Sequence, residues 1–108
     1  MKKENFTGRA LSLNKLISYQ KNSVVSIELA KKQAGTITLF AFDKGQGLSE
    51  HAASFDAFIQ VIDGLAEVRV AGKKFRLKKG AAVILPANKP HSVHAPKKFK
   101  MLLAMIKS

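Results

Sequence analysis

The sequence contains no cysteine and no tryptophan, and only one tyrosine and three prolines among its 108 residues. Without cysteine the chain forms neither disulfides nor thiolate zinc sites, a composition that fits a reducing compartment. No apolar run approaches the roughly 20 residues of a membrane-spanning helix. The first residues also lack the apolar stretch of a secretory signal. We therefore expect a cytoplasmic protein without a membrane partner.

Acidic residues are scarce: seven stand against 19 Lys and Arg, for a formal net charge of +12. Such an excess keeps nucleic acid among the partner classes to be considered. The lysines, however, occur as separate pairs between apolar runs, where paired lysines are commonly solvated turn residues that protect strand edges. From the sequence alone we do not expect a nucleic-acid partner. A basic nucleic-acid-associated protein remains the third and least supported function.

Hydrophobic residues make up 46% of the chain, enough for one core, and the length fits a single domain over residues 1–108. We expect residues 1–23 to form an N-terminal arm or edge strand, with Ala10–Ser18 extended. Strand-sized runs separated by turn residues predict an all-β sandwich or barrel. Asp63–Gly64 predicts a hairpin turn. The runs are Val24–Ala30, Thr36–Phe42, Phe58–Ile62, Leu65–Ala71, Phe75–Lys78, Ala81–Leu85 and Phe99–Ile106.

Residues 65–78 alternate between apolar and charged side chains, which separates the inside of the barrel from its outside. The outward positions form a basic face, Arg69, Lys74, Arg76 and Lys78. We interpret this face as solvated surface; the alternative is a patch that contacts phosphate or another polyanion. The residues expected in the walls and core are Val68, Val70, Phe75, Leu77, Val83 and Leu85.

Two segments resemble the paired motifs of the cupin superfamily. Residues 45–64 match the first motif in spacing, with Gly45, His51, Ala53, Ala57 and Gly64 at its marked positions. Residues 80–95 match the second, with Gly80, Pro86, Asn88, His91 and Ala95. The resemblance implies a small single-domain cupin: a double-stranded β-helix, or jelly-roll-like barrel, of antiparallel strands. Asn88 replaces a family glycine, and asparagine tolerates the left-handed conformation that this turn requires.

The resemblance also places the family's four metal ligands at His51, Ala53, Ala57 and His91. Two of these positions are alanine, whereas a protein-bound transition metal usually has three or four protein ligands. We therefore expect no cofactor and keep His51 and His91 only as weak candidates for a divalent metal. Strand alternation directs the other candidate ligands away from the barrel interior: Glu50, Asp56, Gln60 and His94.

The matched spacing predicts that His51 and His91 face each other at the mouth of the barrel. The expected pocket consists of these two residues with Ala53, Ala57, Ile59 and Val93, an apolar cup with two imidazoles. The alternative is that both histidines are inert, hydrogen-bonded core residues.

Three functions follow, and no catalytic residue can be named for any of them. The first is binding of a small metabolite in the barrel without metal catalysis, and the positive charge of the chain favours an anionic one. The second is a metal-dependent cupin enzyme of the isomerase or dioxygenase type, as the resemblance implies, with a sparse His51/His91 site. The third is the nucleic-acid-associated protein. We also expect a homodimer, because small cupins commonly pair through outer strands and open sheet edges favour association.

Overall fold

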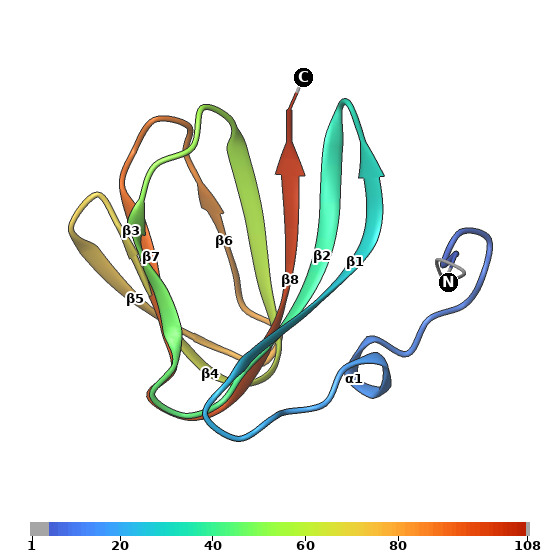
Figure 1. Cartoon of the computed structure of the whole chain (residues 1–108). Coiled ribbons are helices and arrows are strands. Elements are labelled where there is room, and N and C mark those ends of the chain that lie inside the picture. The colour runs from blue at the N-terminus through green and yellow to red at the C-terminus, as the bar shows by residue number, and fades with distance from the viewer. Residues whose placement is uncertain (1–4, 108) are drawn as a thin grey trace.

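The structure, a computed structural model, describes residues 5–107 and consists almost entirely of antiparallel strands that curl around a common interior (Figure 1). This confirms the all-β barrel that the sequence predicts. No helix in residues 5–107 is long and apolar enough to cross a membrane. The elements are α1 Leu13–Leu16, β1 Val24–Lys32, β2 Gly35–Phe42, β3 Gly47–His51, β4 Asp56–Val70, β5 Lys73–Lys78, β6 Ala82–Leu85, β7 His91–His94 and β8 Phe99–Ile106.

Strand β4 connects the two halves of the barrel. The strand order is β1-β2-β8-β4-β7-β3, and β5 and β6 also pair with β4. The first part of β4, residues 56–64, pairs with β8 and β6, whereas residues 65–70 pair with β5 and β7. One strand therefore belongs to both sheets and pairs with different strands in each.

The hairpin expected at Asp63–Gly64 is wrong, because β4 continues through both residues. Gly64 has the expected positive φ, +78°, but it directly follows a bulge, where the register with β8 shifts between Val61 and Asp63. A positive φ serves a β-bulge as well as it serves a turn, and a bulge bends and twists the strand instead of reversing it. Gly64 is thus the corner at which β4 passes from one sheet to the other.

The barrel interior holds the main hydrophobic core. Phe42 and Phe99 stack there with their ring centroids 4.5 Å apart, and Ile59, Val61 and Met101 are almost fully buried beside them. All six residues predicted for the walls and core contribute. Val68, Leu77 and Leu85 are buried, and Val70, Phe75 and Val83 are half-buried against the same cluster.

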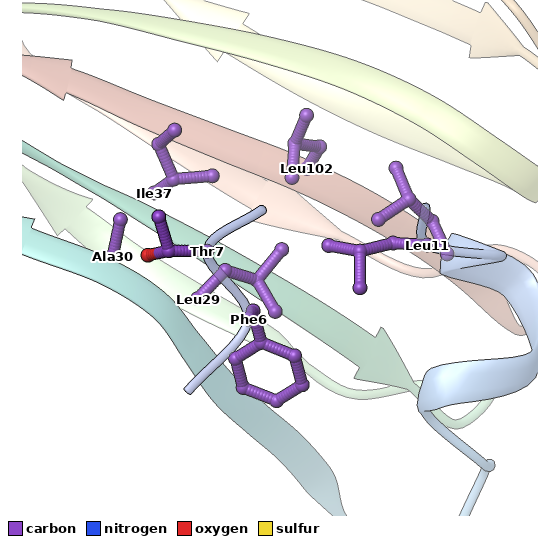
Figure 2. Close-up of a pocket in the computed structure, with 8 residues that line it drawn as sticks. Phe6, Thr7, Leu11, Leu29, Ala30, Ile37 and Leu102 are labelled. Atoms are coloured by element: carbon purple, nitrogen blue, oxygen red, sulfur yellow. The ribbon is translucent and has the colours of Figure 1, made fainter. Parts of the chain in front are cut away.

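The N-terminal arm runs outside the barrel beside β1 (Figure 1). A single helical turn, Leu13–Leu16, replaces the short strand considered for Ala10–Ser18, and residues 5–23 contain no strand. Ile17 packs on Leu39 and Ala41 on the outer face of β2. An apolar pocket of about 280 Å³ remains between arm and sheet, with Phe6, Leu29, Ile37 and Leu102 among its walls (Figure 2).

Two polar contacts fasten the arm to the barrel. The Tyr19 hydroxyl donates to Asp63 Oδ2 at 2.5 Å. Burial, and then the hydrogen bond to Asp63, raise the pKa of Tyr19, so the phenol keeps the proton that it donates. The buried Lys100 ammonium donates to the carbonyl and side-chain oxygens of Asn14, at 2.7 and 2.9 Å. These bonds give the buried amine and the half-buried phenol the partners that their burial requires.

Candidate functional site

His51 and His91 are direct neighbours on adjacent strands. His51 is the last residue of β3, His91 is the first residue of β7, and the two are register partners. Their Nε2 atoms lie 3.1 Å apart, with the rings edge to face at a centroid distance of 4.3 Å. His91 is buried, whereas His51 is exposed. The structure therefore brings the predicted pair together side by side on one wall at the rim of the interior.

The turn before β7 fixes the position of His91. Asn88 has the left-handed φ of +64° that its place in the motif requires. Its amide donates to the Ala53 carbonyl at 2.7 Å, and the Ala87 amide donates to Asp56 Oδ1 at 2.8 Å. One backbone–backbone hydrogen bond and one hydrogen bond to the Asp56 side chain thus tie the two motif segments together. Asp56, exposed as expected, supports the turn and does not point at the imidazoles.

Both imidazoles are oriented by backbone carbonyls. His51 Nδ1 lies 2.8 Å from the Ser49 oxygen, and His91 Nδ1 lies 3.3 Å from the Lys89 oxygen. A carbonyl oxygen only accepts, so each Nδ1 must carry a proton. When each ring carries only that proton, two acceptor Nε2 atoms face each other. These two Nε2 atoms are satisfied only when a hydrogen-bond donor lies between them. The donor is either a ring that has taken up a second proton or a polar group of a bound molecule.

Burial, together with the neighbouring His51, lowers the pKa of His91, and the Lys89 carbonyl opposes this only in part. The buried ring therefore stays neutral near pH 7. At that pH His91 does not supply a third proton to the pair.

The pH dependence of the folding stability should reflect the lowered pKa of His91. The unfolded chain takes up a proton at His91 more readily than the folded chain does, so stability is full above the ordinary histidine pKa of about 6.5. It falls as the pH drops through the lowered pKa of folded His91. We expect the melting temperature to decrease between about pH 7.5 and 5, and His91→Gln to flatten this slope. His94→Gln, on an exposed side chain, should leave the slope unchanged; equal slopes in the wild type and His91→Gln would contradict the assignment.

All six predicted pocket residues line one cavity below the imidazoles, and that cavity is small. Its volume is about 60 Å³, room for about two water-sized groups, whereas pockets for drug-sized ligands measure about 300–1,000 Å³. The sequence did not predict five further side chains that line this cavity. Alternation along residues 99–106 could have indicated the three from β8. The additional lining residues are Leu48, Leu85, Met101, Leu103 and Met105.

The residues present do not fit a tight metal site of the family's kind. Ala53 and Ala57 line the cavity without a donor atom. In residues 5–107 no group of three or more His, Cys, Asp or Glu side chains could hold a metal ion. His94 and Glu50 are exposed, and Gln60 donates to the Gly80 carbonyl at 3.4 Å. Two imidazoles remain, fewer than a structural or catalytic zinc normally takes from a protein.

Comparison with known proteins decides the family. The family model described as "Cupin domain" matches residues 38–106. The chain belongs to the cupin family. No curated protein matches the sequence. The match takes in both imidazoles and every strand of the barrel except β1 and the start of β2.

Several solved cupins share this fold over nearly the whole chain. A conserved Streptococcus pyogenes protein of unknown function is 31% identical, with a TM-score of 0.89 over 94% of this chain and 89% of its own. A Desulfitobacterium hafniense cupin superfamily protein is 29% identical, with a TM-score of 0.88 over 94% of both chains. A cupin 2 conserved barrel domain protein from Leptotrichia buccalis is 40% identical, with a TM-score of 0.87, over 90% of this chain but 47% of its own.

More distant cupins include enzymes. Salicylate 1,2-dioxygenase from Pseudoaminobacter salicylatoxidans is 17% identical over 77% of this chain, with a TM-score of 0.72. At that identity the likeness concerns the fold alone. Because one fold carries many functions, the function of this cupin has to be argued from its own site.

Proposed function

We propose that this cupin binds a short organic acid without metal catalysis, with the carboxyl group at His51 and His91 and the apolar end in the cavity. The observation that carries the proposal is the pair of carbonyl-anchored imidazoles, whose Nε2 atoms lie 3.1 Å apart and are both acceptors when each ring carries its proton on Nδ1. A protonated carboxyl group supplies one donor and accepts in return. The acid and the two rings then share the proton that the neutral pair lacks.

The size of the cavity limits the rest of the ligand. A volume of about 60 Å³ accommodates a chain of about two or three carbon atoms. The walls are apolar, which favours a hydrocarbon end over a second polar group. Met101 and Met105 are flexible side chains that can shift to admit one more carbon atom. Acetate, propionate and butyrate are the acids that fit this description.

Isothermal titration calorimetry with these three acids tests the proposal. At neutral pH they are carboxylates, so binding must take up a proton, and the heat should vary with the ionisation enthalpy of the buffer. Affinity should rise as the pH falls from about 7.5 to 6. The matched control ligands are the methyl esters of acetic and propionic acid, which accept hydrogen bonds but have no hydrogen to donate and should bind at least about 10-fold more weakly. Equal binding of acid and ester, or no binding of either, would refute the proposal.

One observation favours the sparse metal site as a second candidate. Two imidazole nitrogens at about 2.0–2.1 Å from one tetrahedral ion are separated by about 3.3 Å, near the 3.1 Å between these Nε2 atoms. Hydrogen bonds from Nδ1 to carbonyls also occur in metal-bound histidines. Elemental analysis of protein purified without chelator distinguishes the candidates. Stoichiometric zinc, nickel, iron or manganese would favour the metal, and its absence, with proton-linked acid binding, would favour the acid.

The homodimer also remains a proposal. Strand β1 is an open edge of the sheet order, and Ile37 on the neighbouring β2 and Ile106 at the end of β8 are exposed. An edge of this kind favours pairing with a second copy. Light scattering at micromolar concentration would decide between dimer and monomer.

A further inference from the structure

The outer face of the β4–β5 hairpin carries a regular array of cations. Lys74, Arg76 and Lys78 occupy alternate positions of β5, so their side chains leave the sheet on one side, about 6.6 Å apart along the strand. Arg69 on β4 is the register partner of Lys74, about 4.8 Å away in the hydrogen-bonding direction. We call these four residues the basic face. Because these residues alternate with inward-facing ones, their side chains all leave the outer face of the sheet. The pairing of β4 with β5 sets the distances between them.

Within the hairpin residues 65–78, Glu67 is the one carboxylate among the outward positions. Its Oε1 lies 3.9 Å from Arg69 Nε and 3.8 Å from Lys74 Nζ. The Glu67 side chain is only 14% exposed, whereas those of Arg69 and Lys74 are 53% and 49% exposed. In the part of the chain that the structure describes, no salt bridge reaches Arg76 or Lys78. The surface seen by a partner is therefore strongly positive.

The fold itself does not require this arrangement. Arg69 and Lys74 are directly opposite each other, and like charges in that position destabilise a strand pair. The single Glu67 carboxylate beside them balances only one of these two charges. The inward residues Val68, Phe75 and Leu77 supply the packing of the hairpin. A polyanion laid across the face would relieve the repulsion, and the charge of +12 on the whole chain would attract it.

We propose that the basic face binds the phosphate backbone of nucleic acid, independently of the cavity at His51 and His91. The face has no aromatic side chain for base stacking, so its contacts are to phosphates and carry no sequence preference. A lipid surface fits less well, because amphipathic membrane binding also needs apolar side chains. The exposed large apolar residues, all of which lie on β1, β2, β6 or β8, are Val24, Ile37, Ile84 and Ile106.

Fluorescence anisotropy with a labelled DNA duplex of about 20 base pairs, at several salt concentrations, tests the proposal. The test variant is R69Q/K74Q/R76Q, which removes three charges from exposed side chains of the basic face. We expect it to weaken binding by about 10-fold or more at low salt, and to reduce the slope of log K against log salt by about 3. Circular dichroism should confirm that the variant keeps the wild-type strand content.

The matched control is K21Q/K31Q/K32Q, which lowers the net charge by the same amount at exposed positions on β1 and the loop before it. It should lose less than about 3-fold in affinity, because those residues are away from the basic face. Equal losses in both variants would mean that net charge alone drives binding, and would overturn the assignment. No wild-type binding at low salt would overturn it too, as would tighter binding to phosphatidylserine–phosphatidylcholine vesicles than to the duplex.

Discussion

Replacing Gly64 by alanine should destabilise the protein by more than about 3 kcal/mol or prevent folding. A Cβ at this position would lie 2.0 Å from the Lys98 carbonyl oxygen and 2.8 Å from the Phe99 Cα. Both atoms belong to the backbone of the segment entering β8, so neither can rotate away. The φ of +78° adds its own strain for any side chain. Because the chain lacks tryptophan, urea unfolding should be followed by circular dichroism.

Gly72 provides the matched control, because it has nearly the same φ, +82°, but nothing within 4 Å of a built Cβ. Gly72→Ala should therefore lose only the backbone term, about 1 kcal/mol. The difference between the two variants measures the close approach of β4 to the segment before β8. Equal losses in Gly64→Ala and Gly72→Ala would mean that the bulge opens at little cost, and the corner would not be rigid.

The double variant His51→Ala, His91→Ala should reduce the affinity for short organic acids by about 100-fold or more, while the barrel still folds. Each hydrogen bond to a charged group contributes about 1.5–3 kcal/mol to binding, and the double variant loses both of those proposed between the imidazoles and the acid. Folding should survive because His51 is exposed and the main core lies below the imidazoles. Calorimetry with propionate measures the affinity, and thermal melting without ligand measures the stability.

His94→Ala is the control for the double variant. His94 is on the same strand as His91 but exposed, and its register partner on β4 is Glu67 on the outer face. Propionate binding should be unchanged in this variant. If the double variant bound propionate as the wild type does, the acid would bind elsewhere, and the proposed role of the imidazoles would be wrong.

The sequence determined the type of fold and the identity of the two facing histidines. Alternation of apolar and charged residues along residues 65–78 places the side chains correctly, because the two faces of a strand repeat every second residue whatever its neighbours are. The spacing of the two motifs brings His51 and His91 together, because the number of residues between turn glycines fixes where each strand starts. Position 88 needs a left-handed residue, and asparagine satisfies that local requirement.

Only the tertiary structure decided the role of Gly64, the size of the cavity and the proton balance of the site. A positive φ is a local property that fits a turn and a bulge equally, and the pairing with β8 selects the bulge. The cavity is small because Met101, Leu103 and Met105 reach it from a strand distant in sequence. The carbonyls of Ser49 and Lys89 that set the imidazole tautomers are backbone groups. Every residue has such a carbonyl, so its direction follows from the folded chain and not from the residue type.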